Sequence, residues 1–175
     1  KYNFSKIKDY SIFEPNLVFY KNNVIFFDNK GSILNFNNNS KLIWKVNNYL
    51  KDEKKYGPLI TLSNFENKLI VADNFAKTYA MNIDTGEILW SKKNTTPFNS
   101  EIKFYKDYFF VIDTSNVLNC FSIKNGEKIW SYETEKSFVN SFKKLSLIIK
   151  DNIIVFNNSL GDITAVDINQ GSLLW

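Results

Sequence analysis

The sequence contains no histidine and no arginine, and only one cysteine among its 175 residues. Without histidine, the segment can form neither a Ser-His-Asp triad nor a histidine-bearing zinc or iron site, and one cysteine cannot make a four-cysteine metal site. The cysteine, Cys120, has no partner for a disulfide within the chain, so cysteine usage does not indicate a compartment. We therefore expect no catalytic residue, no metal site and no cofactor in this segment.

Positive charge is carried entirely by lysine, and the formal net charge is only +4. Proteins that read nucleic acid rely on arginine forks and on clustered basic stripes. Here the charges alternate in short runs, such as Lys-Asp-Glu-Lys-Lys at residues 51–55. The sequence therefore argues against a nucleic-acid partner, and glycine-rich phosphate loops are absent as well.

Long apolar runs are also missing. No stretch approaches the roughly 20 residues that a membrane-spanning helix needs. The chain opens with Lys-Tyr-Asn-Phe rather than with a methionine or a secretory signal, and its last residue, Trp175, lies inside a repeated motif. We therefore expect a piece of a longer protein, which would meet a membrane only through a lipid anchor outside this segment.

What the sequence does contain is a repeated motif that ends in tryptophan. Residues 78–90 read Thr-Tyr-Ala-Met-Asn-Ile-Asp-Thr-Gly-Glu-Ile-Leu-Trp, and their key positions recur at the same offsets in two later copies. A fourth, divergent copy has Ser40 in the glycine position and is one residue shorter before it. The shared positions are the tryptophans Trp44, Trp90, Trp130 and Trp175, the glycines Gly86, Gly126 and Gly171, the isoleucines Ile83, Ile123 and Ile168, and the small residues Ala80, Cys120 and Ala165.

Each copy contains four short runs of β-branched and aromatic residues separated by Asn, Gly and Asp, a pattern typical of antiparallel strands joined by tight turns. The tryptophans are 40 to 46 residues apart, which is the length of a four-stranded propeller blade. No segment shows a helical period. We predict an all-β fold in which residues 1–175 form one partial β-propeller, with about four four-stranded antiparallel blades in an open arc. The repeats are expected at residues 16–46, 58–92, 101–132 and 144–175, with residues 1–14 ending a preceding repeat or forming a linker.

Side-chain alternation gives the third strand of each copy two apolar faces. In the second copy Met81 and Ile83 share one face, and Ala80 lies on the other. Two apolar faces are expected when a sheet is sandwiched between neighbouring sheets. We therefore predict that Cys120, in the position of Ala80, is a small buried apolar group rather than a nucleophile.

The remaining motif positions predict turns and inter-blade packing. The glycine, as in Asn125-Gly126, is expected at positive φ in a two-residue hairpin turn, so Ser40 predicts a distorted turn in the first copy. Each tryptophan is expected in an outermost strand, where its ring fills the gap between blades. Asp73 and Asp113 recur at the end of the second strand and are predicted to cap the following turn.

Two connections, residues 47–57 and 133–143, are long and polar and carry aromatic residues among lysines. Loops held by a rigid scaffold commonly carry recognition, and aromatics with lysines provide anchoring area and steering charge for an acidic or extended partner. The alternative is that both segments simply cross between blades and bury their aromatics in the seam. The candidate partner-binding residues are Tyr49, Lys51, Lys54, Lys55, Tyr56, Phe138 and Phe142.

The motif resembles the pyrroloquinoline-quinone-like β-propeller repeat, whose pattern runs Ala-x-Asp-x-x-Thr-Gly-x-x-x-Trp. Residues 80–90 and 165–175 fit this pattern, and residues 120–130 fit it with cysteine in place of the alanine. The resemblance covers nearly the whole chain and is specific for the repeat. It implies that the blades are part of a larger, eight-bladed propeller.

Two branches of that family imply different functions. Quinoprotein dehydrogenases hold their quinone with an adjacent cysteine pair, an arginine, a tryptophan floor and a calcium ion, and this segment lacks the first two. The other branch is the cofactor-free propeller lipoprotein of the outer-membrane β-barrel assembly machinery. The resemblance therefore implies a non-catalytic scaffold for protein–protein interaction in the bacterial periplasm, in outer-membrane protein assembly. The alternative is a fragment of a quinoprotein dehydrogenase whose cofactor-binding residues lie outside this segment.

Overall fold

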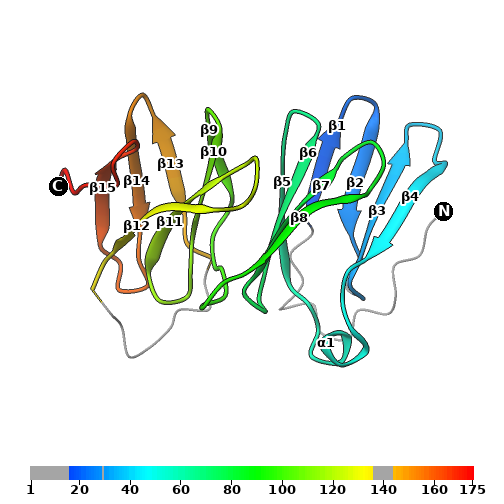
Figure 1. The fold of residues 1–175 in the computed structure, drawn as a ribbon, viewed down its shortest axis with the longest axis horizontal. Coiled ribbons are helices and arrows are strands. Elements are labelled where there is room, and N and C mark those ends of the chain that lie inside the picture. Colours follow the sequence, from blue (N-terminus) through cyan, green and yellow to red (C-terminus); the bar gives the residue numbers. More distant parts are fainter. Residues whose placement is uncertain (1–15, 29, 136–143) are drawn as a thin grey trace.

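The computed structural model describes residues 16–28, 30–135 and 144–175. Four antiparallel sheets stand side by side in the order of the sequence, with the first and the last at opposite ends of the row (Figure 1). In each sheet the strands follow one another in chain order. The prediction of an all-β, partial β-propeller with an open arc of blades is confirmed.

The strands have the following bounds. Blade 1 contains β1 (Leu17–Tyr20), β2 (Asn23–Phe27), β3 (Ser32–Asn37) and β4 (Leu42–Asn47). Blade 2 follows the short helix α1 (Lys51–Lys55) and contains β5 (Ile60–Phe65), β6 (Lys68–Asp73), β7 (Lys77–Asn82) and β8 (Ile88–Lys93). Blade 3 contains β9 (Lys103–Tyr105), β10 (Tyr108–Ile112), β11 (Val117–Ser122) and β12 (Lys128–Glu133). Blade 4 contains β13 (Leu147–Lys150), β14 (Ile153–Asn157) and β15 (Ile163–Asp167).

The hydrophobic core lies between the blades, in three seams. On β7, Met81 faces blade 1 and shares a buried cluster with Ile25 and Trp44. Ala80, the preceding residue, belongs instead to the cluster that contains Phe109 of blade 3. Successive residues of a strand point to opposite faces, so the third strand of a blade contributes to two seams at once.

The third seam follows the same rule. Cys120 on β11 occupies the position of Ala80 and is buried in the cluster that joins blades 3 and 4, together with Phe156 and Val166. Burial raises the pKa of the Cys120 thiol to about 12. The thiol therefore stays protonated near neutral pH and packs as a small apolar group.

Tryptophan from one blade rests on the glycine turn of the next. The indole Nε1 of Trp90 donates a hydrogen bond to the carbonyl oxygen of Ile123 at 3.0 Å, as that of Trp44 does to Ile83 at 3.0 Å. Gly126 has φ +70°, and a Cβ added there would lie 2.5 Å from Cζ3 of Trp90. Glycine is required at this position both by the backbone conformation and by the indole ring.

The turn that carries this glycine is longer than the two residues predicted. Four residues separate β11 from the pairing residue Glu127, and the Gly126 N–H donates to the Ser122 carbonyl at 2.9 Å. The longer loop includes Ile123, whose carbonyl accepts the Trp90 bond. In the first copy Ser40 keeps a left-handed φ of 60°, but its N–H reaches back only three residues, to Asn37.

Two further expectations differ from the structure. Residues 51–55 form α1, which is too short for its sequence to show a helical period. Residues 172–175 were expected to form the fourth strand of blade 4, but they make only an isolated bridge between Leu173 and Val166. The Ala165 N–H still donates to the Trp175 carbonyl at 2.9 Å, which reproduces the pairing of Ala80 with Trp90.

Trp175 differs from the other tryptophans in its exposure. Its residue is 65% exposed, whereas Trp44 is 8% exposed and Trp90 and Trp130 are half-buried. The buried rings are covered by the glycine turn of the following blade, and the structure describes no blade after blade 4. Trp175 is exposed because no glycine turn covers its ring among the described residues.

Candidate functional site

The blades have two ends with different connections. At the hairpin end lie the turns between first and second strands and between third and fourth strands, including the Trp–Gly contacts. At the crossover end lie the turns between second and third strands and the crossovers from one blade to the next, including α1 at the bottom of Figure 1. Because the candidate partner-binding residues lie in crossovers, this second end is the candidate site.

A buried Asp or Asn side chain organises the crossover end of every blade. In blade 2 the Oδ1 of Asp73 accepts the backbone N–H of Phe75 at 2.9 Å and that of Lys77 at 2.8 Å. In blade 3 Asp113 accepts two N–H groups in the same way. The predicted turn-capping role of Asp73 and Asp113 is therefore confirmed.

The other two members of this set, Asp28 and Asn158, were not predicted. Asp28 Oδ1 accepts the N–H groups of the turn in blade 1, and Asn158 Oδ1 does so in blade 4. The signal was present in the sequence, because the capping residue precedes the tryptophan by 17 residues in the last three copies and by 16 in the shorter first copy. Asparagine in place of aspartate concealed the fourth member.

The second polar atom of the capping side chain holds the incoming crossover. Asp73 Oδ2 accepts a hydrogen bond from the Tyr49 hydroxyl at 2.9 Å, and Asp113 Oδ2 accepts one from the Thr96 hydroxyl at 2.6 Å. In blade 4 the Asn158 amide donates to the Thr134 hydroxyl at 3.4 Å. Each crossover is thus tied to the blade that it enters.

Ionisation of this anchor is governed by burial. Burial raises the pKa of Asp73, against the opposing effect of the hydrogen bonds from the Lys77 N–H and the Tyr49 hydroxyl. Burial also raises the pKa of Tyr49, and the neighbouring Tyr79 and Asp73 raise it further. Tyr49 therefore remains a protonated donor, and the pair fastens the crossover rather than transferring protons.

The candidate residues of the first crossover separate into two groups. Tyr49 is only 5% exposed, so the expectation that it is available to a partner is wrong: its hydroxyl is needed at Asp73, and its ring packs in the seam. Tyr56 is 80% exposed, and Leu50, which was not predicted, is 74% exposed. The three lysines of α1 are also exposed. Phe138 and Phe142 lie outside the described residues.

Lys77 attaches α1 to blade 2. Its Nζ lies 3.2 Å from Glu53 Oε1 and 4.9 Å from the centre of the Tyr49 ring. Glu53 also accepts the Leu50 N–H at 2.7 Å, and this bond, followed by the Lys77 contact, lowers the pKa of Glu53. The Lys77 and Glu53 side chains are 20% and 22% exposed. Lys77 of β7 therefore contacts both α1, through Glu53, and the residue Tyr49 that precedes it, and these contacts hold α1 against blade 2.

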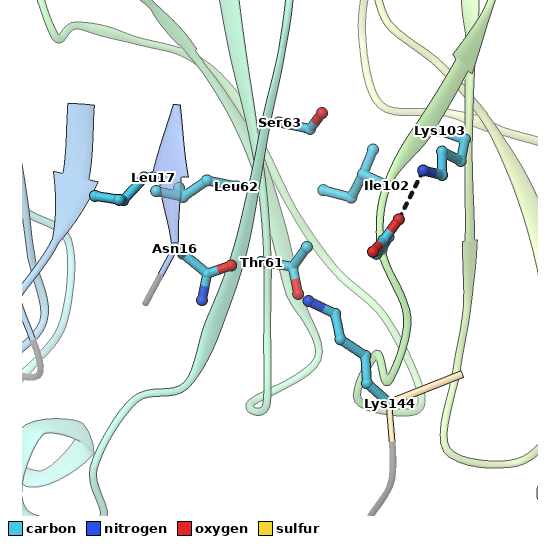
Figure 2. Close-up of a pocket in the computed structure, with 9 residues that line it drawn as sticks. Asn16, Leu17, Thr61, Leu62, Ser63, Ile102, Lys103 and Lys144 are labelled. Atoms are coloured by element: carbon cyan, nitrogen blue, oxygen red, sulfur yellow. Dashed lines mark ion pairs between the residues drawn. The ribbon is translucent and has the colours of Figure 1, made fainter. Parts of the chain in front are cut away.

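A cavity of about 230 Å³ lies among the inner strands (Figure 2). It is lined by residues of β1 and β5 and by the segment that enters β9, and it contains the Lys103–Glu101 ion pair at 2.6 Å. Trp44, Trp90 and Trp130 lie on outermost strands, so they offer no floor here. The cavity lining contains neither tryptophan nor cysteine.

The described residues do not fit the quinone and calcium that the dehydrogenase branch implies. Cys120 is buried in a seam away from the cavity lining. Across residues 16–28, 30–135 and 144–175, no three Asp, Glu, His or Cys side chains are grouped so that they could hold a metal ion. The donor set for a quinone-dependent reaction is therefore not assembled in this part of the chain.

A family model matches most of this chain. The family model described as outer membrane protein assembly factor BamB matches residues 29–175, most of the chain. The chain belongs to the BamB family. No curated protein matches it by sequence.

Solved structures show the same fold. BamB from Moraxella catarrhalis is similar with a TM-score of 0.75 and 16% identity, over 97% of this chain and 49% of that protein. The computationally designed Ika4 protein is similar with a TM-score of 0.68 and 16% identity, over 97% and 99% of the two chains. A quinohemoprotein alcohol dehydrogenase from Pseudomonas putida HK5 has a TM-score of 0.69 and 12% identity, over 91% and 33%.

These likenesses concern the fold, and this BamB-family chain spans about half the length of the Moraxella protein. Its crossover end presents an anchored helix with exposed lysines and two exposed apolar side chains. The arrangement is suited to contact with another macromolecule. The only helix among the described residues is five residues long, so none of them forms a helix that could cross a membrane.

Proposed function

We propose that this BamB-family protein is a non-catalytic scaffold that binds other proteins in the periplasm during assembly of outer-membrane β-barrel proteins. The observation that carries the proposal is the family match over residues 29–175. In the full protein a lipid anchor outside this segment would hold the scaffold at the outer membrane.

The polar side chains of the candidate site support a structural role. Asp73, Asp113 and Asn158 are buried, and their hydrogen bonds go to turns and crossovers. A catalytic acid or base must reach a reacting group, and these side chains are already engaged within the fold. Crossovers can vary while the seams stay constant, which is how a rigid scaffold presents recognition residues.

The alternative function is that of a quinoprotein dehydrogenase. The similarity to the quinohemoprotein alcohol dehydrogenase favours it, over 33% of that enzyme's length. Under this alternative the cofactor-binding residues lie outside this segment. Among the described residues, the cavity lining contains no cysteine, arginine or tryptophan, and no three acidic or cysteine side chains are grouped to hold a metal ion.

Affinity purification of the tagged full-length protein from bacterial envelopes tests the proposal. We expect outer-membrane β-barrel assembly proteins to co-purify and the protein to fractionate with the periplasm or outer membrane. In parallel, pyrroloquinoline quinone and Ca²⁺ are added to the pure protein. Stoichiometric quinone binding with dye-linked alcohol oxidation would overturn the scaffold assignment in favour of the dehydrogenase, and envelopes that yield no assembly protein would overturn its proposed setting.

A further inference from the structure

The charges of α1 are sorted by the fold, although they alternate along the sequence. Lys51, Lys54 and Lys55 have the spacing i, i+3 and i+4, which places them on one face of a helix. Glu53 turns toward the blade, where Lys77 and the Leu50 N–H engage its carboxylate. Asp52 lies 3.6 Å from Lys55. Glu53 is therefore withdrawn from the exposed face, whereas Asp52 is exposed and pairs with Lys55. Three exposed lysines and one exposed aspartate leave the outward charge of α1 positive.

Two apolar side chains flank this basic face. Leu50 directly precedes α1 and Tyr56 directly follows it, and they are 74% and 80% exposed. Five residues of helix span about 7.5 Å, so one partner surface can contact both. An exposed tyrosine can serve as an anchor in a protein interface, and the lysines around it can steer an acidic partner toward it.

The pose of these residues is fixed before any partner binds. Tyr49 is tied to Asp73 on one side of the helix, and the Asn74 side chain bonds the Leu59 N–H at 2.9 Å and the Gly57 carbonyl at 3.3 Å on the other. Glu53 and Lys77 hold the middle. Preorganisation reduces the entropy lost on binding, which makes this exposed segment a better binding element than a loop of the same composition.

We propose that the basic face of α1, together with Leu50 and Tyr56, docks an acidic protein segment that carries apolar side chains among its carboxylates. The inference rests on the scaffold function proposed above and identifies the surface and the chemistry of one partner.

The wider crossover end favours a protein over an anionic membrane. Among the described residues the crossover end exposes charges of both signs: Lys30, Lys92 and Lys93 on blades 1 and 2, and Glu133, Glu135 and Asp162 on blades 3 and 4. A flat anionic lipid surface would attract the lysines of this end and repel its exposed acids. A protein partner can match both, because its charges can be arranged to complement them.

Fluorescence anisotropy on the full-length protein tests this inference. The probe is a synthetic acidic peptide with interspersed Leu and Phe, and its counterpart has every acid replaced by lysine. We expect binding of the acidic peptide only, weakened at least about tenfold by K51E/K54E/K55E and several-fold by Tyr56→Ala. The matched control, K41E/K45E/K124E, makes the same change in net charge at exposed lysines outside the crossover end and should retain binding.

Equal weakening by both triple variants would overturn the inference, because the effect would then depend on net charge alone. It would also be overturned if vesicles of phosphatidylethanolamine and phosphatidylglycerol bind through α1 while the acidic peptide does not. The scaffold function is judged separately by co-purification. If assembly proteins co-purify equally with wild type and K51E/K54E/K55E, and the peptide does not bind, then the function stands and the α1 surface is wrong.

Discussion

The hairpin end and the crossover end of the blades differ in how far they repeat. At the hairpin end the same contact, tryptophan on glycine, occurs in all three seams. At the crossover end the capping Asp or Asn recurs, but it holds a tyrosine in one crossover and a threonine in the next two. Among the described residues, a helix occurs only in the first crossover. Contacts that repeat from blade to blade thus serve packing, whereas crossovers that differ from one another can carry residues that bind a partner.

Removing a buried tryptophan should lower the free energy of unfolding more than any other change considered, because it removes one of the repeated Trp–Gly contacts at the hairpin end. Trp44→Ala is expected to lower the free energy of unfolding by about 3 to 5 kcal/mol, because it removes a buried ring and its bond to Ile83. Tyr56→Ala is the control and should cost less than about 0.5 kcal/mol, since it removes an aromatic ring that is 80% exposed. Urea unfolding measures both, and equal losses would contradict the seam assignment.

Alanine substitutions at two glycines, Gly126 at the hairpin end and Gly57 at the crossover end, should distinguish the cost of backbone strain from the cost of steric overlap. Gly126 and Gly57 both have φ +70°, but an added Cβ meets the Trp90 ring only at Gly126 and meets nothing within 4 Å at Gly57. Gly57→Ala should cost about 1 kcal/mol from the left-handed backbone alone. Gly126→Ala should cost about 3 kcal/mol, because overpacking adds to the strain. Similar losses in urea unfolding would show that the ring imposes no constraint.

The contribution of Asp73, which anchors the first crossover through Tyr49, to the free energy of unfolding should depend on pH. The pKa of Asp73 is raised in the folded state, so its contribution to stability is full below the unfolded pKa of about 3.9 and is lost as pH rises through the folded pKa. Asp73→Asn removes this titration and keeps a capping oxygen, as Asn158 does in blade 4. In urea titrations the variant should therefore gain stability relative to wild type as pH rises above the unfolded pKa of about 3.9, until the folded pKa of Asp73 has been passed. A constant or reversed difference would contradict the burial of a carboxylate.

The smallest effect on stability is expected from breaking the ion pair that holds α1 against blade 2. Lys77→Met should change the free energy of unfolding by less than about 1 kcal/mol, because the pair with Glu53 is a single, partly exposed ion pair. It should nevertheless speed amide hydrogen exchange in α1. Lys55→Met, which breaks a fully surface pair with Asp52, should leave exchange unchanged. Equal exchange in both variants would show that Lys77 does not hold the helix.

The architecture could be predicted because it repeats. Four copies of one pattern reveal strands, turns and tryptophans even where a single copy is ambiguous, as with Ser40 in the glycine position. The turn length was predicted wrongly from Asn125-Gly126, because local sequence favours a two-residue turn while Trp90 of the preceding blade contacts a longer loop. Contacts between blades are long-range, and local propensity does not contain them.

The candidate site could be predicted only in part, for the same reason. Residues 47–57 are correctly identified as a long crossover, but nothing in that segment shows which aromatic is buried. Tyr49 is buried because Asp73, 24 residues later, accepts its hydrogen bond, and Tyr56 is exposed because no comparable acceptor meets it among the described residues. The sorting of the α1 charges likewise depends on Lys77, which lies in the third strand of the next blade.

The Trp–Gly contact also gives the stack of blades a direction. Blades 2, 3 and 4 each have a glycine turn that contacts a tryptophan ring of the blade before, and blades 1, 2 and 3 each supply that tryptophan to the blade after, so two such blades fit in one order only. A single repeat carries both halves of this contact. Tandem duplication of one repeat therefore creates a complete new seam at once, without any compensating substitution, whereas an inverted or partial copy would leave a tryptophan uncovered. The contact between one indole ring and one glycine therefore favours the lengthening of such a protein by duplication of whole repeats.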